Sequence, residues 1–78
     1  MKIYPNPTTN DLYINSNELI LKITVFDLKG SQVKTIQQGT GILSVMDIPP
    51  GLYLLKIDFA KSTINTKFIK EWQMRFIF

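Results

Sequence analysis

Alternation of apolar and polar side chains at every second position is the feature that most constrains the fold of this chain. Leu12 and Ile14 share one face of a short run, and Tyr53, Leu55 and Ile57 share one face of another. A strand directs successive side chains to opposite faces, whereas a helix repeats its apolar positions about every 3.6 residues. The pattern therefore predicts short β-strands that each bury one face.

A third run, Leu19–Leu28, is rich in the branched and aromatic residues that pleated sheets favour. Lys22 and Thr24 are expected on its polar face. Its apolar face is expected to consist of Leu19, Leu21, Ile23 and Val25. The run should form a hairpin with Gln32–Ile36, because Asp27-Leu28-Lys29-Gly30 between them predicts a tight turn in which glycine adopts a positive φ.

Further turn residues separate the remaining runs at a spacing of about ten residues. Breaks are predicted at Gly39-Thr40-Gly41 and at the rigid Pro49-Pro50-Gly51, since proline cannot donate to a strand ladder. Three more strands are predicted at Ile42–Met46, Leu52–Phe59 and Thr63–Lys70, the last two as a hairpin. Six or seven short strands at this spacing predict an all-β sandwich or barrel, because a lone sheet would leave one apolar face in water.

The N-terminal segment Tyr4-Pro5-Asn6-Pro7 has a different character. A proline disfavours helical backbone in the residue before it, so Tyr4 and Asn6 should be extended. We expect a semi-rigid segment that leads into the sandwich, with the Tyr4 ring covering an edge of the core.

The chain lacks the residues on which most catalytic and metal sites depend. It has no histidine and no cysteine, which excludes Ser–His and Cys–His nucleophile pairs, imidazole and thiolate metal sites, and disulfides. Asp11, Asp27 and Asp47 flank turns, where aspartate is favoured for backbone hydrogen bonding alone. Gly39-Thr40-Gly41 lacks the lysine and helix of a phosphate loop, and no carboxylate run suits calcium. We therefore predict a domain with no enzymatic activity and no cofactor.

The charge pattern argues against nucleic-acid binding. The net charge is +3, and the basic residues are scattered rather than gathered in a stripe with stacking aromatics. No apolar run reaches the ~18 residues of a membrane helix, and the N-terminus lacks the layout of a signal peptide. A secreted protein of this kind would carry its signal upstream, in a longer parent chain.

The positions of the three tyrosines distinguish between two kinds of domain. Tyr4, Tyr13 and Tyr53 are expected to pack at the edges of the sandwich with their hydroxyl groups in water. If all three lay on one exposed plane, they would instead indicate an Ig-like accessory binding or adhesive module of a secreted enzyme or surface protein.

Four blocks stand out by residue type and spacing. They are Tyr4-Pro5-Asn6-Pro7 with Asp11-Leu12-Tyr13-Ile14, the run Ile23–Gly30 followed by Val33, the run Met46–Ile57 with its Pro-Pro-Gly-Leu-Tyr core, and Lys67-Phe68-Ile69-Lys70. Each block resembles part of the type IX secretion C-terminal sorting domains, the Por secretion tail family. The blocks occur in that family's order and spacing and span residues 3–70.

The resemblance implies an Ig-like antiparallel β-sandwich of six to seven short strands that folds in the periplasm of a Gram-negative bacterium. It implies a secretion signal for a cargo domain attached at the N-terminus, recognised by the type IX outer-membrane translocon. A sortase-like surface peptidase then removes the domain, upstream of or near Tyr4, and the cargo is released or joined to a surface lipopolysaccharide. The cargo would be secreted or held at the cell surface.

The resemblance also implies roles for single residues. We expect the translocon to recognise Lys67, Phe68, Ile69 and Lys70, with charge and backbone presented at one edge while Phe68 and Ile69 face the core. Structural roles are expected for the other matched residues: Tyr4, Pro5, Asn6, Pro7, Asp27, Gly30, Pro50, Gly51 and Tyr53.

The chain departs from the family after Lys70. Residues 1–70 are expected to form the sorting domain, and Glu71–Phe78 an atypical apolar tail with three aromatic residues. Three accounts of the tail stay open: an added edge strand, a contact that makes a homodimer, or an unordered ending from an altered reading frame. A tail that covers the last strand would hinder recognition by the translocon.

Overall fold

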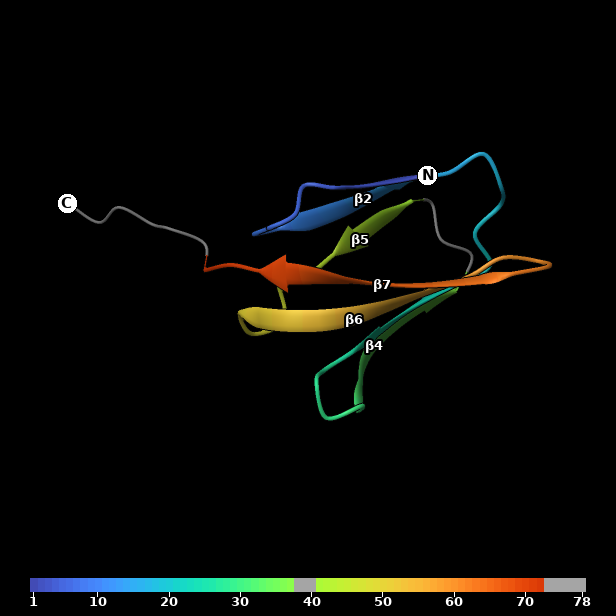
Figure 1. The fold of residues 1–78 in the computed structure, drawn as a ribbon. Coiled ribbons are helices and arrows are strands. Elements are labelled where there is room, and N and C mark those ends of the chain that lie inside the picture. Colours follow the sequence, from blue (N-terminus) through green and yellow to red (C-terminus); the bar gives the residue numbers. More distant parts are fainter. Residues whose placement is uncertain (38–40, 73–78) are drawn as a thin grey trace.

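Two antiparallel sheets stacked face to face make up the domain (Figure 1). The structure is a computed structural model and describes residues 1–37 and 41–72. One sheet has three strands in the order β1-β2-β5, and the other has four in the order β4-β3-β6-β7. The strands are β1 Lys2–Tyr4, β2 Asp11–Asn15, β3 Lys22–Phe26, β4 Gln32–Gln37, β5 Ile42–Ser44, β6 Gly51–Asp58 and β7 Thr63–Lys70. The prediction of an all-β antiparallel sandwich is confirmed.

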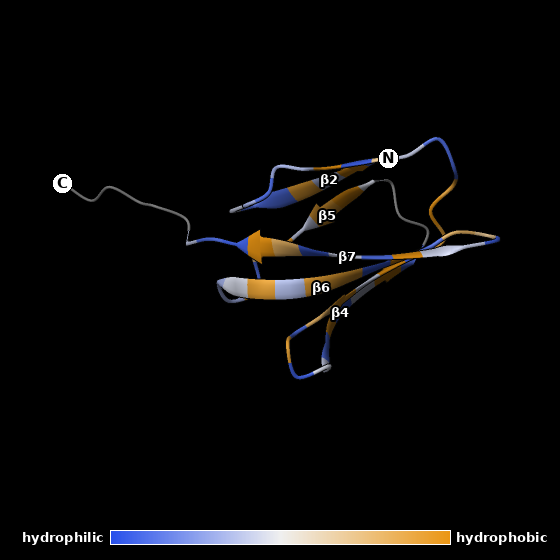
Figure 2. Ribbon diagram, in the orientation of Figure 1, coloured by the Kyte–Doolittle hydropathy of each residue, from blue (hydrophilic) through white to orange (hydrophobic). Residues whose placement is uncertain are grey.

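The hydrophobic core lies between the sheets and draws on both of them. It consists of Leu12, Ile14, Ile20, Ile23, Val25, Leu43, Val45, Ile48, Tyr53, Leu55, Ile57, Phe59 and Phe68. Along β6, Tyr53 and Leu55 are at most 6% exposed, whereas Leu52 and Leu54 are 38% and 41% exposed. Figure 2, which is coloured by hydropathy, shows both apolar and polar bands along β6. The predicted faces of the run Leu52–Phe59 are therefore confirmed.

The start of β3 differs from the prediction. The strand begins at Lys22, and before it Leu19 is 76% and Leu21 41% exposed, while Ile20 is buried. The assignment of Leu19 and Leu21 to the apolar face is therefore wrong. Residues 16–21 carry the chain from β2 to β3, which belong to different sheets, so the alternation of β3 does not extend back through this crossing. Within β3, Ile23 and Val25 are buried as predicted.

The tight turn predicted at Asp27–Gly30 is present between β3 and β4. Asp27 Oδ1 accepts hydrogen bonds from the backbone N–H groups of Lys29 and Ser31, each at 2.9 Å. Gly30 has φ +86°, a left-handed conformation that a Cβ atom disfavours. Asp27 thus acts through its own turn, as aspartate commonly does.

Two predicted features lie partly outside the described residues. The break predicted at Gly39-Thr40-Gly41 is described only at Gly41, and the tail Glu71–Phe78 only at Glu71 and Trp72. The three accounts of the tail therefore stay predictions. Within the described ranges, no helix is long and apolar enough to cross a bilayer.

Candidate functional site

The last strand, β7, lies at the edge of the four-stranded sheet, and its C-terminal end is held by the N-terminal proline segment. The Thr8 N–H donates to the Ile69 carbonyl at 2.9 Å, and the Glu71 N–H donates to the Thr8 carbonyl at 2.8 Å. Asn6 Oδ1 accepts a third hydrogen bond from the Ile69 N–H at 3.0 Å. We call Asn6 and Thr8 the N-terminal clamp. The first and fourth blocks of the sequence are thus in direct contact.

The clamp corrects the expectation for the N-terminal segment. The segment does not simply lead into the sandwich, because Lys2–Tyr4 form β1 and pair with β2, and Thr8 forms a parallel bridge to Lys70. Thr8 is only 2% exposed, and its hydroxyl donates to the Asp11 carbonyl. The segment is therefore part of the folded domain.

Loss of the clamp should loosen the end of β7. In Asn6→Ala, the Ile69 N–H loses its acceptor, and we expect its amide hydrogen exchange to quicken by about fivefold, since the lost bond contributes ~1 kcal/mol to local stability. Hydrogen exchange followed by NMR measures this effect. Amides in the middle of β6, such as that of Leu55, serve as the internal control and should change little. Equal acceleration at both places would show global destabilisation instead.

The side chains of β7 alternate between two environments. Phe68 is fully buried and Lys70 is 6% exposed, whereas Lys67 is exposed and Ile69 is 45% exposed. The expectation that Ile69 faces the core is therefore wrong, and so is the expectation that Lys70 presents its charge. Adjacent residues of a strand point to opposite faces, so Phe68 and Ile69 cannot both face inward. Of the four predicted recognition residues, only Lys67 and Ile69 present their side chains on the outer face.

Lys70 has an internal role. Its Nζ donates to the Ile48 carbonyl at 3.0 Å, in the connection between β5 and β6. The nearby Asp47 carboxylate is exposed and forms an ion pair with Lys34 at 2.9 Å. The hydrogen bond from Lys34 is the main cause that holds the pKa of Asp47 below its ordinary value, and the charge of Lys70 adds a smaller contribution. Lys70 thus joins the end of β7 to the β5–β6 connection.

The third block packs against the fourth. The Tyr53 ring stacks on Phe68 with ring centroids 5.6 Å apart, and its hydroxyl donates to the Pro49 carbonyl. Gly51 pairs with Lys70 in the β6–β7 ladder and has φ +154°. These contacts hold β7 along the edge that pairs with β6, whereas the clamp holds its opposite edge.

The partly buried Tyr53 hydroxyl should give the domain a pH dependence at high pH. Burial is the main cause that raises the pKa of Tyr53 above its ordinary value of 10.0, and the negative charge of Asp27 adds to it. Because the folded pKa lies above the unfolded one, the phenol loses its proton in the unfolded chain first as pH rises. The contribution of Tyr53 to the free energy of unfolding is therefore fully present below pH 10 and is lost as pH rises through the folded pKa. Tyr53→Phe should cost ~1 kcal/mol at neutral pH by removing the hydrogen bond to Pro49.

Urea denaturation of the wild type and of Tyr53→Phe, from neutral pH to about pH 11, measures this contribution. We expect the stability difference between the two proteins to shrink above pH 10, where only the wild type has this phenol to ionise. A difference that stays constant across the range would contradict the account.

The tyrosines do not form the exposed plane that would indicate an aromatic binding module. Tyr4 and Tyr13 stack at 5.6 Å and are 48% and 38% exposed, on paired positions of β1 and β2. Tyr53 is buried in the core at 6% exposure. The Tyr4 ring thus lies on the outer face of the three-stranded sheet, not over an edge of the core as expected.

The described residues contain no group of three or more His, Cys, Asp or Glu side chains placed to hold a metal ion. What the structure does gather is a surface on the outer face of the four-stranded sheet. There Lys67 is paired with Leu54, Leu54 with Phe26, and Asn65 with Lys56. The sequence interpretation missed Phe26, Leu54 and Lys56 as neighbours of Lys67. Counting back from the β6–β7 turn would have found the last two, because a hairpin fixes its register.

A comparison with known protein families now adds to this geometry. The family model of the secretion system C-terminal sorting domain matches residues 2–71. The chain belongs to this family. The match covers every strand described above, and both the clamp and β7 lie within it. No match was found among curated proteins.

Membership of the sorting-domain family supports a general function. The domain is a C-terminal sorting signal of the type IX secretion system. Such a signal implies an interaction with the secretion system and a cargo attached at the N-terminal side. Tail domains of this family belong to proteins that are secreted or exported to the cell surface.

Proposed function

We propose that this domain directs its attached cargo through the type IX outer-membrane translocon after folding in the periplasm, and that it catalyses no reaction itself. The family match over residues 2–71 is the observation that carries the proposal. The outward side chains of β7, Lys67 and Ile69, support it, because exposed groups on an edge strand are available to another protein. In this proposal residues 1–70 are the sorting domain and residues 71–78 a separate tail.

The proposal includes removal of the domain by a sortase-like surface peptidase, which releases the cargo or joins it to a lipopolysaccharide. We place the cut N-terminal to β1, because Lys2–Tyr4 pair with Tyr13–Asn15 in an antiparallel ladder. A peptidase acts on backbone that is not held in a ladder, so a cut at Tyr4 would require β1 to open first. The structure thus favours the upstream part of the range expected from the sequence.

A reporter fused in front of residues 1–78 tests the proposed export. The fusion is expressed in a type IX-competent bacterium and in the same strain without a working translocon. We expect the reporter at the cell surface or in the medium of the competent strain only. Equal amounts outside both strains, or retention in both, would contradict the proposal.

Mass spectrometry of the domain released in the competent strain tests the position of the cut. The N-terminal residue of the released domain should be Lys2 or a residue upstream of it. A released domain that begins at Pro5 or later would show that β1 opens or is itself cut.

A further inference from the structure

The outer face of the four-stranded sheet carries apolar side chains at one end. Leu52, Leu54 and Ile69 are 38%, 41% and 45% exposed, and Phe26 is half-buried. They share one face because Leu52 pairs with Ile69 and Leu54 pairs with Phe26 in the ladders. A row of apolar side chains left in water adds nothing to the stability of a domain this small. Exposed apolar patches commonly mark interaction sites.

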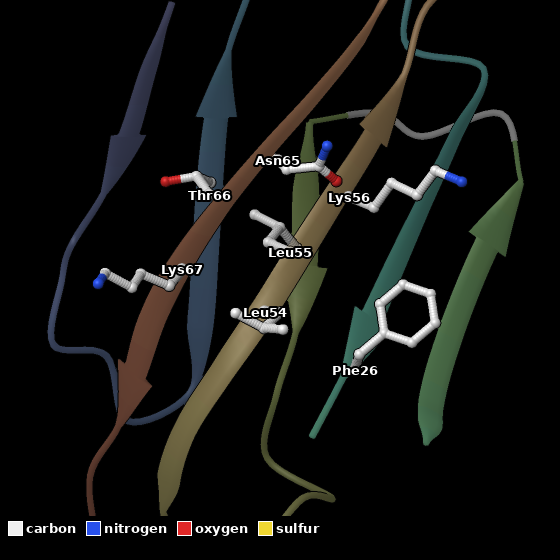
Figure 3. Close-up of a pocket in the computed structure, with 7 residues that line it drawn as sticks. All are labelled: Phe26, Leu54, Leu55, Lys56, Asn65, Thr66 and Lys67. Atoms are coloured by element: carbon white, nitrogen blue, oxygen red, sulfur yellow. The ribbon is translucent and has the colours of Figure 1, made fainter. Parts of the chain in front are cut away.

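A groove lies on this face. It has a volume of about 510 Å³, and the outward side chains that line it are Phe26, Leu54, Lys56, Asn65 and Lys67. Figure 3 shows Leu54 in the middle, the Phe26 ring on one side, and the two lysine side chains extending in opposite directions. The groove therefore has an apolar floor and a positive charge on each side.

Among the residues that the structure describes, no carboxylate lines this groove. In the described part of the chain, neither Lys56 nor Lys67 forms a salt bridge, and Asp58, further along the same face, accepts a hydrogen bond from the Thr63 hydroxyl at 2.9 Å. Both ammonium groups are therefore available to an external acid. A ligand with carboxylates on both sides of an apolar side chain would pair with both lysines and cover the apolar floor of the groove.

We propose that the groove docks a protein segment of the translocon that presents an apolar side chain flanked by acidic residues. This inference rests on the proposed function and extends recognition from β7 across β6 to Phe26 of β3. A protein segment fits better than a membrane surface, because the apolar side chains lie in a shallow depression with Phe26 half-buried, whereas a bilayer is entered by protruding apolar side chains. Charge pairing at its rim would steer the encounter and fix its register.

The double variant Leu54→Glu/Lys56→Glu tests the proposal, since it puts two carboxylates where an acidic segment would dock. The matched control is Ile42→Glu/Lys61→Glu, which makes the same charge change at exposed positions of β5 and of the β6–β7 turn, outside the groove. Both are made in the reporter fusion and as purified domains whose folding is checked by thermal unfolding. We expect export to fall by about tenfold or more for the groove variant and to stay within about twofold for the control.

A photo-crosslinking residue at position 54 gives a direct readout in the same fusion. It should form an adduct with a translocon component identified by mass spectrometry, and the same residue at position 42 should not. Wild-type export of a folded groove variant would overturn the proposal while leaving the proposed function intact. Binding of the purified domain to anionic phospholipid vesicles that is lost in the groove variant, with export unchanged, would assign the face to a membrane and also overturn it. If the unaltered fusion is not exported, the proposed function fails and this inference fails with it.

Discussion

Phe68→Ala should lower the free energy of unfolding of this domain by ~3–5 kcal/mol, the range for large-to-small changes of aromatic core residues. Phe68 is fully buried on the inner face of β7 and stacks on Tyr53 at a centroid separation of 5.6 Å. A domain of this length has a total stability of roughly 4–12 kcal/mol. The variant should therefore be largely unfolded in mild denaturant or near body temperature.

The neighbouring residue provides the control for this prediction. Ile69→Ala removes a branched side chain of the same strand, but Ile69 is 45% exposed, so the loss should be under ~1 kcal/mol. Urea denaturation of both isolated domains, followed by circular dichroism, measures the difference. Equal losses for the two variants would contradict the assignment of the inner and outer faces of β7.

Gly41→Ala should be the most damaging of the small substitutions, with an expected loss of ~3 kcal/mol or more. Gly41 has φ +88°, and a Cβ atom there would lie 2.7 Å from the backbone oxygen of Ile14. The two residues cannot move apart freely, because the Ile14 N–H donates to the Gly41 carbonyl at 2.7 Å. Backbone strain of ~1–3 kcal/mol and a backbone clash therefore add at one position.

Gly30→Ala separates these two contributions. Gly30 has nearly the same backbone conformation, φ +86°, but an added Cβ would meet no atom of the described residues within 4 Å. Its loss should reflect strain alone, ~1–2 kcal/mol. Thermal and urea unfolding of the two variants gives the comparison. If Gly30→Ala were as destabilising as Gly41→Ala, the contact with Ile14 would contribute nothing.

The parts of the fold that follow from local alternation could be predicted from the sequence. Leu52–Phe59 and Thr63–Lys70 are long enough for the period of two to define their faces and their hairpin. The observed β7 has the predicted bounds, and β6 differs from its prediction by one residue at each end. The resemblance to sorting domains, carried by four blocks, gave the family that the comparison then showed.

The predictions that were wrong concern residues whose burial depends on their position in the strand rather than on their hydropathy. Leu19 and Leu21 are apolar but precede the strand, in a crossing between sheets, so their exposure is not set by the pleat of β3. Hydropathy alone predicts Ile69 inside and Lys70 outside, whereas strict alternation from the buried Phe68 places Lys70 inside and Ile69 outside. A lysine can be buried here because the Ile48 carbonyl accepts from its Nζ.

The clamp could not be predicted from local patterns at all. Asn6 and Ile69 are 63 residues apart, and their hydrogen bond depends on how the two sheets stack. The same holds for the groove, where Phe26 comes from a strand distant in sequence from Leu54 and Lys67. Such contacts follow from tertiary packing, which propensity and periodicity do not encode.

The burial of Phe68 also affects how the signal can be tested. Deleting residues 63–78 would remove a core side chain along with the proposed recognition residues, so loss of export after that deletion would not distinguish recognition from unfolding. Surface substitutions on β7 make this distinction, because Lys67 and Ile69 project from the outer face while Phe68 stays in place.

The most direct test of the central claim is therefore the export of a reporter fused to the Lys67→Glu/Ile69→Glu variant, beside Ile42→Glu/Lys61→Glu as the control of equal charge change at exposed positions away from β7. Both domains are first shown to be folded, with unfolding free energies within ~1 kcal/mol of the wild type, as expected for exposed positions. The account predicts that export falls by about tenfold or more for the β7 variant and is retained for the control. Export of the folded β7 variant at the wild-type level would contradict it.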